Sequence, residues 1–62
     1  MSLYIARDVY GTLYLYDNTP IKKGIYFQPQ RGYDMMELDD RLFPEITFAN
    51  SPQEVELKLI NK

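Results

Sequence analysis

The stretch that decides the fold is LYIARDVYGTLYLY, residues 3–16. Both of its ends are rich in aliphatic, aromatic and β-branched residues, which favour strands. Between them, Asp8 suits the first position of a type I turn, because its side chain can accept hydrogen bonds from the backbone that follows. Gly11 supplies the left-handed residue that a bulge after such a turn requires. The stretch therefore predicts a β-hairpin over residues 3–17.

The turn also predicts the register of the two strands. If Asp8 faces Thr12, then Ile5 faces Leu15 and the side chains of each directly opposed pair lie on one face of the sheet. The register separates an aliphatic face, with Leu3, Ile5, Leu13 and Leu15, from a tyrosine face, with Tyr4, Ala6, Tyr14 and Tyr16. We expect the aliphatic face to form the core. The tyrosine face could lie under another segment, line a groove or meet a second subunit.

The rest of the chain predicts further short strands separated by turns. Strands are expected at residues 24–28, 33–38, 45–48 and 54–60, with a turn at 17–20 and an exposed bend at 22–24. In the last of these strands the alternation places Val55, Leu57 and Leu59 on one face. The segment 39–43 predicts one short helical turn that Pro44 ends, with Leu42 and Phe43 as its apolar anchor. Residues 1–62 are thus expected to form a single mainly β domain, an antiparallel sheet or small barrel of about five strands.

A chain of 62 residues buries little surface and usually needs a further stabiliser. Disulfides and the usual zinc ligands are excluded, because the sequence contains neither cysteine nor histidine. Two stabilisers remain. One is an aromatic core, since six Tyr and three Phe are present. The other is self-association into a homo-oligomer.

Charge is unevenly distributed along the chain. Residues 1–33 carry four basic and two acidic side chains, or +2, and residues 34–62 carry three basic and seven acidic ones, or −4, which together give the net charge of −2. The two halves can pair within one domain or between subunits. The acidic balance disfavours a nucleic-acid partner. As an alternative function, the segment 22–33 could bind single strands, with cations for phosphates and rings for stacking. The residues of that alternative patch are Lys22, Lys23, Tyr26 and Arg31.

No pattern for catalysis, cofactor binding or metal binding emerges from the residues. Without His or Cys, nucleophilic catalysis lacks its usual base and its most reactive nucleophile. Five carboxylates fall close together, but their spacing matches no calcium loop and a solvated face explains them. They are Asp34, Glu37, Asp39, Asp40 and Glu45. The three glycines are isolated and do not form a phosphate loop. We therefore expect a protein that is not an enzyme.

The leading hypothesis from the sequence is a non-catalytic protein-interaction or accessory module that self-associates. Tyrosine is enriched at interfaces because it combines a large rigid ring with a hydroxyl group. Tyr4, Tyr14 and Tyr16 are the predicted contact surface. No secretory signal is present and no apolar run approaches the length of a membrane span, so a cytoplasmic protein without a membrane partner is expected.

A resemblance covers most of the chain. The residues that carry it are the stretches 4–8, 11–16, 37–38, 42–48 and 51–57, together with Pro20. In these stretches the chain resembles a group of small uncharacterised proteins of gut bacteria, associated with phages or other mobile elements. The resemblance implies a small cytoplasmic accessory or binding protein. It implies no activity and assigns no site residue.

Overall fold

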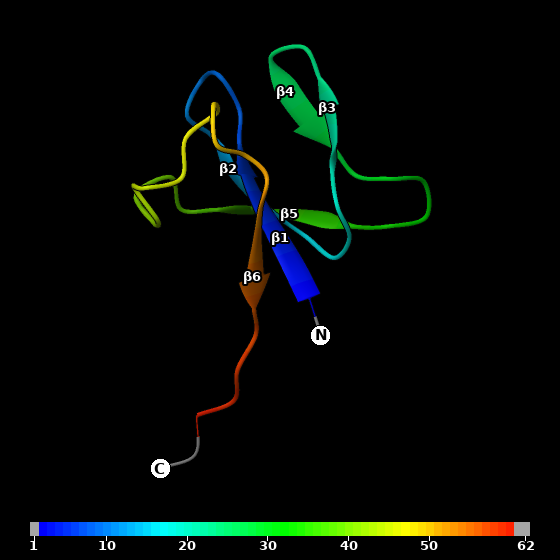
Figure 1. The fold of residues 1–62 in the computed structure, drawn as a ribbon, viewed down its shortest axis with the longest axis vertical. Helices are drawn as coiled ribbons and strands as arrows, with labels where there is room; N and C mark the ends of the chain where they lie inside the picture. The colour runs from blue at the N-terminus through cyan, green and yellow to red at the C-terminus, as the bar shows by residue number, and fades with distance from the viewer. Residues whose placement is uncertain (1, 61–62) are drawn as a thin grey trace.

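The first hairpin forms with the predicted register in the computed structural model, which describes residues 2–60 (Figure 1). Strand β1 spans Ser2–Arg7 and strand β2 spans Leu13–Tyr16. Ile5 is paired with Leu15, as the turn chemistry predicts. The separation into an aliphatic and a tyrosine face is therefore confirmed.

The turn between β1 and β2 shows why this register is adopted. The Asp8 backbone N–H donates to the Thr12 carbonyl at 3.0 Å. The Asp8 side chain accepts hydrogen bonds from the backbone N–H groups of Tyr10 and Thr12, at 2.9 and 3.0 Å. Gly11 has φ of 92°, which L side chains rarely adopt. Because both the backbone and the Asp8 side chain hold the turn, β1 and β2 pair in this one register.

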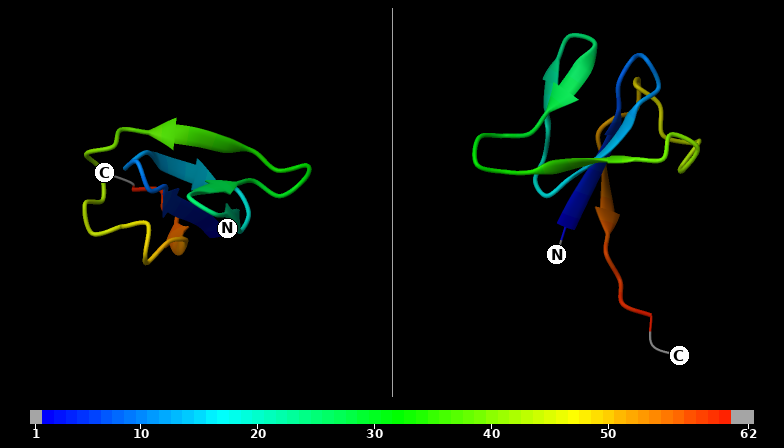
Figure 2. Two further views of the ribbon diagram at one scale, coloured as in Figure 1. Left: turned by 90° about the horizontal axis from the view of Figure 1, so that it is seen from above. Right: turned by 180° about the vertical axis from the view of Figure 1, so that it is seen from behind.

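Two more strands extend this hairpin into a four-stranded antiparallel sheet. Strand β5, Met35–Leu38, pairs with β2, and strand β6, Gln53–Glu56, pairs with β1, so the order is β5-β2-β1-β6. A second hairpin of β3, Ile21–Lys23, and β4, Tyr26–Gln28, forms its own two-stranded sheet. Figure 2 shows this second hairpin beside the main sheet. The main sheet is open, because β5 and β6 are its edges and do not pair with each other.

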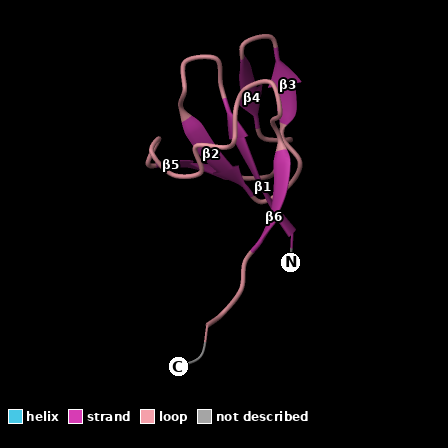
Figure 3. Cartoon of the chain, turned by 60° about the vertical axis from the view of Figure 1, so that its left-hand side comes forward, coloured by secondary structure: helices cyan, strands magenta, loops and turns pink. Residues whose placement is uncertain are grey.

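The predicted helical turn at 39–43 does not form, and Figure 3 shows only strands and loops in the described residues. Two consecutive β-turns occupy its place. The Leu42 N–H donates to the Asp39 carbonyl at 3.0 Å and the Ile46 N–H to the Phe43 carbonyl at 2.9 Å. Phe43 has φ of 48°, which no right-handed helix accepts. Leu42 and Phe43 are 46% and 43% exposed, so the apolar anchor of this loop is the buried Ile46 instead.

Strand boundaries also differ from the prediction, since β4 begins at Tyr26 and not at residue 24, and β5 begins at Met35 and not at residue 33. Residues 45–48 form turns and no strand, because they belong to the loop that wraps the end of the sheet. The expected bend at 22–24 is partly a strand, since Ile21–Lys23 pairs with β4. The strand expected at 54–60 ends at Glu56, which is paired with Ser2, the first residue of β1. No helix in the described part of the chain is long and apolar enough to cross a membrane.

The core consists of two clusters, one on each face of the main sheet. On the aliphatic face Ile5, Leu13 and Ile46 are buried, with Leu15, Leu38 and Val55 packed against them. On the tyrosine face Ala6, Tyr16 and Phe27 are buried, with Tyr4, Tyr14 and Phe48 packed against them. The loop between β5 and β6 supplies Ile46 to one cluster and Phe48 to the other. The same loop therefore contributes to the cover of both faces.

Arg7, at the end of β1, attaches that loop to the sheet. A guanidinium group has five N–H donors in a planar fork. The Nε–H group donates to the Ile46 carbonyl at 2.6 Å. Nη1 donates to the carbonyls of Gly11, at 2.7 Å, and Asp40, at 3.0 Å. Nη2 donates to the carbonyls of Leu42, at 3.0 Å, and Phe43, at 3.1 Å. The Arg7 backbone N–H adds a bond of 2.9 Å to the Ser51 hydroxyl. One side chain thus supplies hydrogen bonds to backbone carbonyls that would otherwise need water.

Candidate interaction surface

The tyrosine face, predicted as the contact surface, is turned toward the chain's own second hairpin. Tyr16 is 1% exposed, and its hydroxyl donates to the Phe27 carbonyl at 3.3 Å. Burial raises the pKa of Tyr16 to about 12, with smaller contributions from Tyr14 and Asp8. A side chain so buried cannot contact a partner in this fold. Tyr16 is therefore a core residue of the described chain, and of the three predicted contact residues only Tyr4 and Tyr14 keep exposed area.

Tyr4 and Tyr14 lie beside Tyr16 and are half-buried. The rings of Tyr14 and Tyr16 are tilted by 55° with their centroids 6.4 Å apart. Phe27 and Phe48 complete the cover with an edge-on contact at 5.9 Å between centroids. The sequence correctly groups the three tyrosines on one face, and the structure uses that face mainly to thicken a thin core.

The structure divides the alternative basic and aromatic patch. Lys23 is directly opposite Tyr26, so both lie on the outer face of the second hairpin. Lys22 is opposite Phe27 on the inner face, and its ammonium group lies 4.6 Å from the centre of the Phe48 ring. Arg31 is exposed in the loop after β4. Only two of the four predicted residues therefore share a face, which is too few for a groove that follows a phosphate backbone.

The clustered carboxylates of residues 34–45 are all exposed. In the described residues, no group of three or more acidic side chains is arranged to hold a metal ion. The side chain of Asp39 accepts hydrogen bonds from Arg41 at 3.0 and 2.7 Å, and these contacts hold the pKa of Asp39 below its usual value. The acidic residues thus form a solvated surface with one local ion pair.

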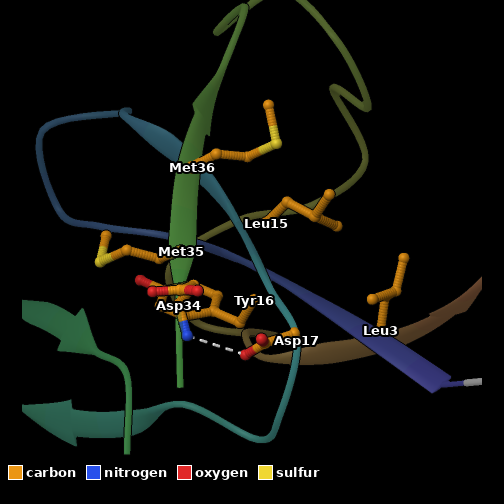
Figure 4. A pocket seen from close by; sticks show the side chains of 7 residues that line it. All are labelled: Leu3, Leu15, Tyr16, Asp17, Asp34, Met35 and Met36. Atoms are coloured by element: carbon orange, nitrogen blue, oxygen red, sulfur yellow. Dashed lines mark hydrogen bonds between the residues drawn. The ribbon is translucent and has the colours of Figure 1, made fainter. Parts of the chain in front are cut away.

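The aliphatic face is open at the end opposite the first turn. A pocket of about 140 Å³ lies there, in the part of the sheet where β5, β2 and β1 are adjacent. Figure 4 shows Leu3, Leu15 and Met36 on one side of the sheet, with Met35 on the other. Met36 is 58% exposed, although it is paired with Leu15 on a face that is otherwise core. We call this region the open end of the aliphatic face.

A second apolar feature leaves the body of the molecule. Residues 57–60, which we call the projecting segment, run away from the sheet beyond β6 (Figures 1 and 2). Leu57, Leu59 and Ile60 are 69%, 83% and 76% exposed. Leu57 and Leu59 flank Lys58 as in a half-buried strand, yet no described part of the chain pairs with residues 57–60. The projecting segment therefore has a strand-like sequence, but it is not paired with any strand in the described part of the chain.

Sequence reasoning missed two of these features. Arg7 gives little local signal of its role, because four of its five carbonyl partners are 33 to 39 residues away in the sequence. The projecting segment is visible in the sequence as an alternating stretch, but alternation alone cannot show that its partner strand is absent.

Comparison with known proteins found no matching family model, no matching curated protein and no matching solved structure. The resemblance to small proteins of gut bacteria and their mobile elements stays a prediction.

Proposed function

We propose that this chain is a non-catalytic interaction module that associates with copies of itself. The projecting segment is the observation that carries the proposal. It presents three large apolar side chains, each at least 69% exposed, beyond the edge of a sheet. Apolar side chains gathered in this way on a soluble protein mark an interaction site more often than a solvated surface.

The small size of the core supports the same conclusion. In the described residues, the buried hydrophobic side chains are six: Ile5, Ala6, Leu13, Tyr16, Phe27 and Ile46. Thirteen large hydrophobic side chains of residues 2–60 are exposed. A domain of this size without disulfides or metal gains stability when a second subunit covers such side chains.

Mass measurement across a range of concentrations tests the proposal. Light scattering of the wild-type chain should show a mass above 7.4 kDa that falls on dilution. A double variant, Leu57→Ser with Leu59→Ser, should remain folded and lose the higher mass. The matched control is Val9→Ser with Tyr10→Ser, at the tip of the first hairpin, where the side chains are 50% and 78% exposed.

The control variant should associate like the wild type. A monomer at every concentration would overturn the proposal. Equal loss of association in both double variants would also contradict it, because the effect would then follow from general surface hydrophobicity and not from the projecting segment.

A further inference from the structure

The outer edge of β6 is unpaired and accessible. Strand β6 is bonded on one side only, to β1. Glu54 and Glu56 of this strand are exposed, and a hollow that they line together with Ser2 lies where β6 pairs with β1, not at its outer edge. An unpaired edge presents a row of backbone N–H and C=O groups to which another extended segment can add. The projecting segment continues directly from this edge strand, so the edge and a segment fit to pair with it belong to one continuous stretch.

We infer that residues 54–60 of two copies pair as antiparallel strands around a two-fold axis at Leu57. The inference rests on the proposed self-association and names the surface that performs it. In this arrangement the projecting segment of each copy runs along the edge of β6 of the other. The two four-stranded sheets then join into one, and each copy gives and receives the same contacts, as a two-fold interface requires.

Charge complementarity selects this register. With Leu57 opposite itself, Glu56 of each copy lies opposite Lys58 of the other, which creates two opposite-charge pairs on one face. On the other face, Leu57 meets Leu57 and Val55 meets Leu59. Directly opposed residues of opposite charge and directly opposed apolar residues both stabilise antiparallel strands. Every residue from 55 to 59 is therefore matched to a partner of suitable chemistry.

The neighbouring registers lose this match. Directly opposed residues must come from the same face of each strand, so Leu57 stays opposite an apolar residue. The nearest alternative registers therefore place the two-fold axis at Glu56 or at Lys58. The first brings Glu54 opposite Lys58 but places Glu56 opposite Glu56, and the second places Lys58 opposite Lys58. Like charges directly opposite each other destabilise a strand pair.

The other edge of the sheet offers no such complementarity. Strand β5 is also bonded on one side only, to β2. Symmetric pairing about Glu37 would oppose two carboxylates, and pairing about Met36 would place Met35 opposite Glu37. Neither register brings opposite charges together. The β6 edge is therefore the one that fits a second copy.

Cysteine substitution tests the position of the axis, in a chain that contains no cysteine of its own. The Leu57→Cys variant should form a disulfide-linked dimer under mild oxidation, because directly opposed residues are close enough for a disulfide. The Leu59→Cys variant is the control. Its position is opposite residue 55, so the two cysteines are about four residues apart along the strand and too distant to bond.

Both substituted positions are highly exposed and outside the strands of the monomer, so the fold should tolerate each change. Selective cross-linking of Leu57→Cys supports the register. Equal cross-linking of both variants, or of Leu59→Cys alone, would overturn it.

Charge exchange separates this inference from self-association in general. Glu56→Lys and Lys58→Glu should each weaken the homodimer about tenfold, because both opposed pairs become repulsive. Mixing the two variant chains should restore dimers, since every opposed pair in the mixed dimer again carries opposite charges. A wild-type dimer that both substitutions leave intact would refute the strand pairing while self-association stands. A wild-type chain that remains monomeric would refute both, and capture of a different protein by an intact monomer would assign the edge to another partner.

Discussion

The two faces of the main sheet are covered to different extents, although the same strands form both. The tyrosine face is closed by the second hairpin, which places Phe27, 5% exposed, over Ala6 and Tyr16. The aliphatic face is closed only near the first turn, where Ile46 is 4% exposed. At its other end Met36 is 58% exposed. How completely a face of the sheet is covered thus depends on which connecting segments pack against it, and not on which face carries the more hydrophobic residues.

This difference reverses the expectation from composition. Tyrosine has a polar hydroxyl and is frequent at interfaces, whereas aliphatic side chains are more often core residues. Here the hydroxyl of Tyr16 finds a backbone carbonyl inside the molecule, which removes the main obstacle to its burial. The aliphatic face keeps an open end, lined by residues of β1, β2 and β5. The less completely covered face of the sheet is therefore the aliphatic one.

The largest effect is expected from removing the cover of the tyrosine face. Phe27→Ala should lower the free energy of unfolding by about 3 kcal/mol, because it leaves a cavity over Tyr16. That loss is comparable to the whole stability of a chain of this size. Urea unfolding measures it. The control is Tyr26→Ala, on the outer face of the same strand, where the ring is 48% exposed. Equal losses in both variants would contradict the asymmetric cover of the hairpin.

A smaller loss is expected from loosening the cover of the aliphatic face. Arg7→Lys should lower the free energy of unfolding by about 2 kcal/mol, because an ammonium group keeps the charge but cannot supply five donors in a planar fork. Chemical denaturation of this variant should be compared with that of Arg31→Lys, an exchange at an exposed loop position. If Arg7→Lys were as stable as the control, the five carbonyl contacts would not stabilise the loop.

The hairpin of the main sheet could be predicted from the sequence, whereas the segments that cover its two faces could not. The first hairpin could be predicted because Asp8 and Gly11 act on residues within four positions, so their chemistry is local. The cover of each face could not, because Ile46 reaches Ile5 and Leu13 through a long loop whose path depends on Arg7. The helical turn failed for a related reason. The carbonyls of Leu42 and Phe43 accept hydrogen bonds from Arg7, and Phe43 has φ of 48°, which a right-handed helix does not accept.

The candidate site was predicted only in part. Grouping Tyr4, Tyr14 and Tyr16 follows from strand alternation and is confirmed, but alternation does not reveal which face another segment will cover. The stretch 54–60 was correctly identified as a half-apolar strand in its first residues. Its last residues have no partner in the described chain, and no pattern within a single strand can show whether its neighbour lies in the same molecule.

Alkaline pH should distinguish the buried tyrosine from the rest of its face. The pKa of Tyr16 rises from its ordinary value of 10.0 to about 12 in the fold. Its contribution to stability is therefore fully present below pH 10 and is lost as the pH rises through about 12. Tyr16→Phe should lose about 1 kcal/mol at neutral pH with the hydroxyl's hydrogen bond. It should also lack the phenolate absorbance step near pH 12. Loss of the variant's phenolate absorbance near pH 10, with no loss near pH 12, would show that Tyr16 is solvated.

The smallest effect on stability is expected at the open end of the aliphatic face. Met36→Lys should change the free energy of unfolding by less than about 0.5 kcal/mol, because its side chain is already largely hydrated. The contrast is Leu38→Lys, on the same face of the same strand but packed against the core cluster, which should cost at least about 2 kcal/mol. Thermal unfolding of the pair measures the boundary between the covered and open ends. Similar losses at both positions would mean that the face is closed along its whole length.

Hydrogen exchange at the backbone amides of residues 57–60 tests the central claim most directly. If a second copy pairs with the projecting segment, the alternate amides that point toward the partner strand should exchange slowly at high protein concentration and become unprotected on dilution, while the paired amides of β1 and β2 stay protected throughout. Rapid exchange of residues 57–60 at every concentration would contradict the claim that this segment completes its sheet with another copy of the chain.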